Sequence, residues 1–125
     1  MVTVILNLAK FGYEIIKDIR NSKRNSEQER QEARRALLEA ARETKFYLDH
    51  LREGGKQEKD KERELSRLWQ TAAHKLYPIN GDLSDRLLLK SEYWVAPEQW
   101  SEGEITKARI GFDSIEEELV KMRNE

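Results

Sequence analysis

Two stretches of regularly spaced apolar residues constrain this chain more than any other feature. In the first, the spacing is 4, 3, 4, 3 and 4 residues, through Ala33, Leu37, Ala40, Thr44, Tyr47 and Leu51. In the second, the spacing is 3, 4, 3, 4 and 3 residues, through Ile105, Ala108, Phe112, Ile115, Leu119 and Met122. Such heptad spacing is typical of helices that pack lengthwise on other helices. The sequence therefore predicts an all-α protein.

Capping residues predict where these two helices begin and end. Ser26 and Ser101 each start a Ser-x-x-Glu sequence, the spacing of a capping box, which predicts helices over residues 27–52 and 102–123. Gly54, together with the glycine after it, predicts the end of the earlier helix, because glycine readily adopts the left-handed conformation that follows a helix.

Two further long helices are expected, over residues 2–20 and about 56–76. The later of them should stop at Tyr77, because the residue before a proline is pushed away from the helical region. Its first turns, Lys56–Arg63, alternate in charge and have no apolar stripe. We therefore expect these turns to be solvated.

The connection between residues 77 and 101 is expected to contain a short helix over Asp82–Lys90, followed by an irregular aromatic segment. That segment carries Tyr93, Trp94 and Trp100. Their apolar area favours packing against the helices, with an aromatic binding groove as the alternative.

Short loops at residues 21–25 and 54–57 predict that consecutive helices run antiparallel. The predicted fold is an antiparallel four-helix bundle with a long connection that holds a short extra helix between the third and last long helices. A chain of 125 residues has the usual size of one domain. We expect residues 1–125 to form a single helical-bundle domain.

The opening segment, Val2–Ile19, is more apolar than a helix on one core requires. On a helical projection its apolar arc covers about 220°, whereas a stripe of roughly 100° or somewhat more suffices for a surface helix. The side of the arc that holds Leu8, Phe11 and Ile15 is expected to face the core. The outer edge is the candidate partner-binding surface, and it comprises Val2, Leu6, Ala9 and Tyr13.

Two glycines inside the expected helices indicate close helix crossings. Gly12 lies in the middle of the apolar arc and Gly111 beside the second heptad stripe. A glycine in a helix interior costs about 1 kcal/mol relative to alanine, so a close approach is the structural reason to keep it. The two glycines are candidates for contact with each other.

The charge pattern argues against a nucleic-acid partner. The chain has 23 basic and 24 acidic residues, a net charge of −1. Acidic residues also interrupt the densest basic group, which should form a salt-bridged loop, with contact to phosphate or anionic lipid as the alternative. That group comprises Lys17, Arg20, Lys23, Arg24, Arg30, Arg34 and Arg35.

The remaining composition bears on location. There is no cysteine, so a disulfide or thiolate metal site is excluded. The opening segment is interrupted by charges, whereas a membrane span needs roughly 20 consecutive apolar residues. It also lacks the flanks of a secretory signal. We expect a cytoplasmic protein.

Motifs that carry chemistry are few. His50 and His74 have no glutamate three residues before them, so the di-iron pattern of helical bundles is missing. Glycine-rich phosphate loops and the common hydrolase and metalloprotease motifs are also missing. We expect no enzyme activity and no catalytic, cofactor-binding or metal-binding residues. A pocket that gathers either histidine with two carboxylates would support an enzyme instead.

These features predict a non-enzymatic helical interaction module, a homo-oligomer or a small partner subunit, that uses the outer edge of the first helix. The alternative is a membrane-associated or membrane-active bundle that acts through residues 1–20, with the first helix lying in the bilayer interface. Nothing in the sequence indicates a small-molecule ligand.

Overall fold

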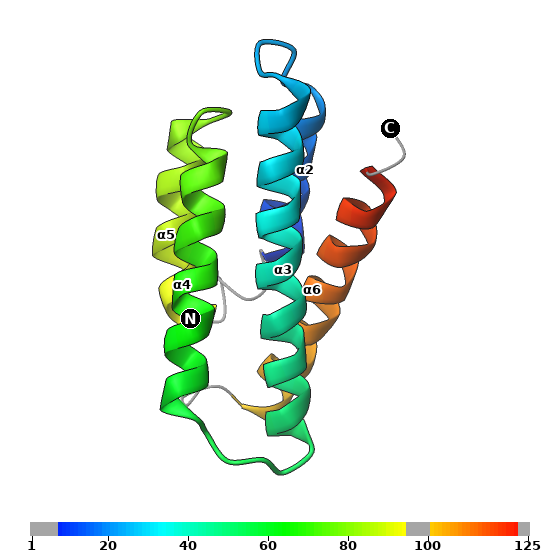
Figure 1. Cartoon of the computed structure of the whole chain (residues 1–125). Coiled ribbons are helices and arrows are strands. Elements are labelled where there is room, and N and C mark those ends of the chain that lie inside the picture. The colour runs from blue at the N-terminus through cyan, green and yellow to red at the C-terminus, as the bar shows by residue number, and fades with distance from the viewer. Residues whose placement is uncertain (1–7, 95–100, 123–125) are drawn as a thin grey trace.

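The computed structural model describes the backbone of residues 8–94 and 101–122, and the side chains of residues 10–92 and 101–122. Within these residues the chain is all-helical and contains no strand. Five helices pack side by side into a bundle (Figure 1). They are α2 (Leu8–Arg20), α3 (Glu27–Arg52), α4 (Lys59–Leu76), α5 (Gly81–Trp94) and α6 (Glu102–Met122).

Local capping explains the ends of α3 and the start of α6. The backbone N–H of Glu29 donates to Oγ of Ser26 at 3.1 Å, and the N–H of Ser26 donates back to Oε1 of Glu29 at 3.1 Å. The same exchange links Ser101 and Glu104 at 3.2 and 3.0 Å. After α3, Gly54 adopts φ of 88°. Both capping boxes and the glycine stop are thus confirmed.

The start of α4 is docked by polar contacts, which corrects the expectation that it is solvated. Glu62 is buried and accepts a hydrogen bond of 2.6 Å from the Tyr47 hydroxyl of α3. That hydroxyl also accepts from the backbone N–H of Glu58 at 3.0 Å. Lys61 adds an ion pair of 2.8 Å with Glu43. A charged sequence without an apolar stripe is therefore held by one tyrosine of the neighbouring helix.

Helix α4 ends where the sequence predicted, but for a different reason. The helix ends at Leu76 as expected, but Tyr77 keeps helical dihedral angles, φ −53° and ψ −44°. The stated reason, displacement of the residue before proline, is therefore wrong. Pro78 has no N–H to continue the ladder, and the turn closes through the N–H of Ile79, which donates to the carbonyl of Leu76 at 2.9 Å.

The connection after α4 contains a longer helix than expected. Helix α5 extends four residues beyond Lys90, so Ser91–Trp94 is helical rather than irregular. It lies along α4 in Figure 1. The side chains of Tyr93 and Trp94, and all of residues 95–100, lie outside the described residues, so the expectations for this aromatic segment stay predictions.

Because α5 runs along α4, α6 runs in the same direction as α2. Gly12 of α2 lies against Ile115 of α6, and about two helical turns further along the same two helices Ile19 lines the same pocket as Met122, so α2 and α6 run parallel. The fully antiparallel arrangement of four long helices is therefore not confirmed. Five traverses of the bundle leave the first and the last helix pointing the same way.

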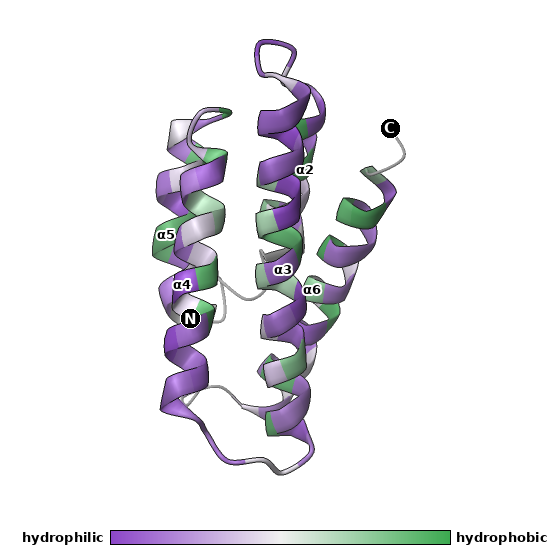
Figure 2. Ribbon diagram, in the orientation of Figure 1, coloured by the Kyte–Doolittle hydropathy of each residue, from purple (hydrophilic) through white to green (hydrophobic). Residues whose placement is uncertain are grey.

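The core gathers side chains from all five helices. Trp69 of α4 packs on Phe112 of α6 with ring centroids 5.8 Å apart, and its indole N–H donates to Thr44 of α3 at 2.9 Å. Hydrophobic residues recur in bands along α3 and α6, between longer hydrophilic stretches of the ribbon (Figure 2). The largest fully buried side chains are Trp69, Phe112, Ile16, Ile19, Leu48, Leu65, Leu76, Leu83, Leu87 and Leu119.

Candidate interaction surface

Most of the apolar arc of α2 is used by the core. Phe11, Ile15, Ile16 and Ile19 are all buried, with at most 5% of each exposed. Gly12 packs directly on α6, where a Cβ would overlap the side chain of Ile115. The glycine therefore marks a close helix crossing. The atoms nearest to a Cβ at Gly12 belong to Ile115, whereas the sequence had suggested Gly111 as the partner.

Tyr13 lies on the opposite edge of the arc and remains 55% exposed. It borders a shallow groove of about 230 Å³ between α2 and α6, which we call the α2–α6 groove. Ile110 of α6 lies one helical turn before Ser114 of this groove and is 57% exposed. The groove is lined by Tyr13, Ile16, Ser114, Ile115, Glu117 and Glu118.

Tyr13 is the one predicted partner-binding residue whose side chain the structure describes. Val2 and Leu6 lie outside the described residues, and Ala9 is described only as part of helix α2. The surface predicted from the four residues together stays a prediction. Sequence reasoning missed Ile110, because it lies off the heptad stripe of α6 and nothing in a single sequence distinguishes an exposed isoleucine from a buried one.

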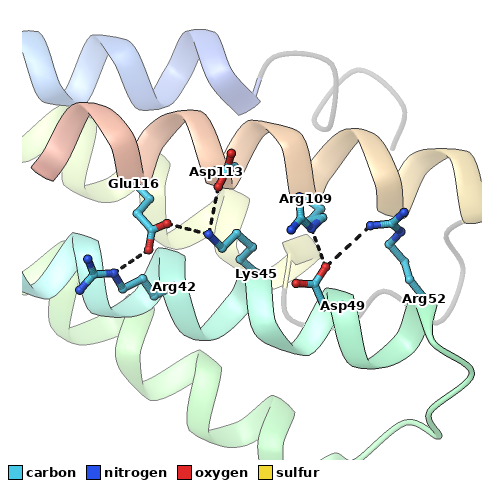
Figure 3. Close-up of polar contacts among 7 residues, drawn as sticks. All are labelled: Arg42, Lys45, Asp49, Arg52, Arg109, Asp113 and Glu116. Carbon is cyan, nitrogen blue, oxygen red and sulfur yellow. Dashed lines mark hydrogen bonds and ion pairs between the residues drawn. The ribbon is translucent and has the colours of Figure 1, made fainter.

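On its other side, α6 is held to α3 by a row of ion pairs, which we call the ionic ladder (Figure 3). Lys45 bridges two carboxylates of α6, Glu116 at 2.6 Å and Asp113 at 3.0 Å. The ladder comprises Arg42, Lys45, Asp49, Arg52, Arg109, Asp113 and Glu116. Cross-helix pairs of this kind fix the register of α6 on α3.

The ladder shifts the pKa values of its central groups. Burial disfavours the charge on Lys45, but hydrogen bonds to Glu116 and Asp113 outweigh it and raise the pKa of Lys45 above its ordinary value. Burial likewise opposes ionisation of Glu116, but hydrogen bonds from Lys45 and Arg42 outweigh it and lower the pKa of Glu116. Both groups are thus held in their charged forms at neutral pH.

The polar cluster at the α3–α4 turn has a structural role. Burial, and then the hydrogen bond to Glu62, raise the pKa of Tyr47 to about 12. His50 stacks on Tyr47, and its Nε2 lies 2.9 Å from the carbonyl oxygen of Lys56 and 3.3 Å from the carboxylate of Glu58. These contacts hold the turn together and leave His50 engaged with backbone.

A second groove lies between α4 and α5, and we call it the α4–α5 groove. With a volume of about 560 Å³, it gathers His74 with the carboxylates of Asp85 and Glu92. This is the grouping expected to favour an enzyme, but within the described residues no hydrogen bond joins His74 to either carboxylate. The histidine is exposed, so no positioned acid–base pair results.

Two members of the basic group expected around the first loop, Arg30 and Arg34, are engaged in contacts within the chain. Arg34 is buried and donates to the carbonyl of Leu119, while Arg30 pairs with Glu27 at 2.7 Å.

In the part of the chain that the structure describes, no cluster of histidine and acidic side chains could hold a metal ion. None of the described helices combines the length and the apolar character needed to cross a membrane.

Comparison with other proteins gives no assignment: no protein-family model matches the chain, and no curated protein or solved structure is significantly similar to it. Its surfaces must therefore be interpreted from their own chemistry.

Proposed function

We propose that this chain is a non-enzymatic helical interaction module that binds a second copy of itself or a protein partner through the outer edge of α2. The observation that supports this most directly is the exposure of Tyr13 and Ile110 beside the α2–α6 groove. Aromatic and large aliphatic side chains are typical anchors of protein interfaces. Glu117 and Glu118 provide the polar rim.

The polar groups elsewhere support a binding role over a catalytic one. The charged groups of the ionic ladder are paired with one another, and the Tyr47 hydroxyl is hydrogen-bonded to Glu62, so these groups make their contacts within the bundle. Catalytic groups usually keep a reactive atom pointed at open space. The most exposed alternative, His74, has no orienting partner among the described residues.

Solution mass tests the self-association form of the proposal. A Tyr13→Lys/Ile110→Lys variant should be monomeric at concentrations where the wild-type chain forms dimers or larger species, as measured by light scattering after size exclusion. Phe46→Lys is the matched control, because Phe46 is 56% exposed on α3, away from the groove. Loss of association in both variants would show a general charge effect and count against the surface.

A separate partner is tested by photocrosslinking in cells that express the chain. A crosslinking residue at position 13 should give a defined product, identified by mass spectrometry, that is not formed from position 46. A wild-type chain that is monomeric at every concentration and forms no product from position 13 would contradict the proposal.

A membrane-associated bundle acting through residues 1–20 is the second proposal. It is favoured by the uncharged run of residues 2–9. Against it, release of α2 exposes Phe11, Ile15, Ile16 and Ile19, at about 1.5–3 kcal/mol for each. Co-sedimentation with anionic vesicles should require residues 1–20, and a full-length chain that does not bind would exclude this proposal.

A further inference from the structure

The α4–α5 groove has the form of a helix-binding site. One wall comes from α4, where Ser66, Gln70, His74 and Tyr77 follow each other at spacings of four, four and three residues. The other comes from α5, where Asp85, Leu88 and Glu92 lie three and four residues apart. Residues at such spacings share one face of a helix. Two aligned faces therefore enclose a straight groove parallel to both helices.

The floor of this groove is closed by contacts that use its hydroxyl groups. Ser84 is buried and donates to the carbonyl of Ala73 at 2.6 Å, which draws α5 onto α4. Ser91 donates to the carbonyl of Leu88 at 2.9 Å. Small serine side chains at these points leave the space above them open, and that space forms the groove.

The accessible part of the groove combines apolar and acidic groups. Leu88 is 38% exposed and Tyr77 is 62% exposed. Of the nine lining residues, Asp85 and Glu92 are the two that carry a carboxyl group. They are seven residues apart on α5, which corresponds to about 10 Å along the helix, with Leu88 between them.

These two exposed carboxylates have no ion-pair partner among the described residues, whereas many other charged side chains of the chain are paired. Across the described residues, the side chain of neither Asp85 nor Glu92 takes part in a hydrogen bond or ion pair. Arg86, next to Asp85 in sequence, is instead directed to Glu14 of α2 and to Asp82. The nearest cation on α5 is therefore turned away from the groove.

The chain itself offers no obvious occupant. Residues 1–7 and 95–100 contain no lysine or arginine, and residues 123–125 contain Arg123 alone, so none of these segments supplies two cations seven residues apart. We propose that the α4–α5 groove docks a basic amphipathic helix from another protein. Its apolar face would cover Leu88 and Tyr77, and its lysines or arginines, seven residues apart, would pair with Asp85 and Glu92.

This surface is separate from the proposed Tyr13 surface. Helices α4 and α5 lie together on one side of the bundle, whereas α6 lies on the other side (Figure 1). The chain would thus carry two binding faces made from different helices. A failure at one face would leave the other untouched, so the two proposals are independent.

The test uses a synthetic amphipathic helix as the probe. Its leucines follow a three- and four-residue spacing, and its lysines lie seven residues apart on the flanks of the leucine stripe. Fluorescence anisotropy measures its Kd for the full chain. Asp85→Lys/Glu92→Lys should weaken binding about tenfold or more, because each substitution replaces an attraction by a repulsion. The affinity of the wild-type chain should fall with added salt.

The matched control is Glu39→Lys/Glu53→Lys, which changes the net charge equally at two exposed positions, one on α3 and one at its C-cap, that line neither proposed binding surface. It should leave the Kd within about twofold of the wild-type value. Equal weakening in both variants, or no binding by the wild-type chain, would overturn the proposal. So would a wild-type dimer that the Asp85→Lys/Glu92→Lys variant abolishes, because the occupant would then be a second copy.

Discussion

Helix α6 is attached to the bundle on two sides by different means. Against α2, the contact depends on shape, because Gly12 lets Ile115 approach the backbone of α2 closely. Against α3, the contact adds charge, with Lys45 placed between Asp113 and Glu116. A contact that depends on shape is insensitive to pH and salt but sensitive to side-chain volume. A contact that depends on charge is sensitive to pH and salt and less sensitive to side-chain volume.

The largest expected effect comes from changing the shape contact. Gly12→Leu should lower the free energy of unfolding by about 3 kcal/mol, because the new side chain must displace Ile115 in a packed core. Urea denaturation followed by circular dichroism measures this.

Gly103→Leu is the matched control, since a Cβ at that position meets only Oγ of Ser101 at 3.9 Å. Its stability should be unchanged or slightly higher. Similar losses for both substitutions would mean that the Gly12 crossing is not tightly packed.

An intermediate effect is expected for the charge contact. Lys45→Met keeps most of the apolar stem but leaves the carboxylates of Asp113 and Glu116 without their shared cation. We expect a loss of about 1–2 kcal/mol in low salt, measured by the same denaturation.

The loss should shrink in high salt, where the wild-type ion pairs are partly screened. Lys107→Met serves as the control, because Lys107 is exposed near the start of α6. A Lys45→Met protein as stable as the wild type would show that the ladder sets register without adding stability.

The smallest effect is a dependence on pH. The pKa of Glu116 is lower in the folded chain than in the unfolded one, so its contribution is complete above the unfolded pKa and is lost as the pH falls through the folded pKa. Stability should therefore decline below about pH 5, and Glu116→Gln should make that decline shallower.

Lys45 behaves in the opposite sense, because its pKa is raised: its contribution is present at neutral pH and is lost only in strong alkali. Glu117→Gln is the control, because Glu117 is exposed, lies next to Glu116 on α6 and takes no part in the ladder, and it should leave the acid slope unchanged. An identical slope for Glu116→Gln would remove the ladder as a source of acid sensitivity.

The features that the sequence predicted correctly are local. The bounds of α3, the two capping boxes and the left-handed Gly54 depend on residues within a few positions of each other. The heptad stripes also predicted burial, as Leu37 and Phe112 illustrate.

The features that were missed depend on residues far apart in the chain. Glu62 looked like one more solvated charge, and only the approach of Tyr47 from α3 makes it a buried anchor. Helix α5 is longer than its sequence pattern indicated and packs along α4, a contact between two helices that no local pattern shows. Of the candidate surfaces, the apolar edge of α2 was predicted, but the α4–α5 groove was not, because it exists only where two helix faces meet.

The parallel pairing of α2 with α6 has a consequence for how the chain is made. The contact between Gly12 and Ile115 joins residues close to opposite ends of the sequence. Contacts of such large sequence separation form late, because the loop between them must first be closed. During synthesis α2 emerges before α6, and α3, α4 and α5 emerge between them. The part of α2 that packs on α6 therefore stays uncovered while α3, α4 and α5 are being made, although α3 can already contact α2, and this exposed apolar surface is a site where chaperones can bind.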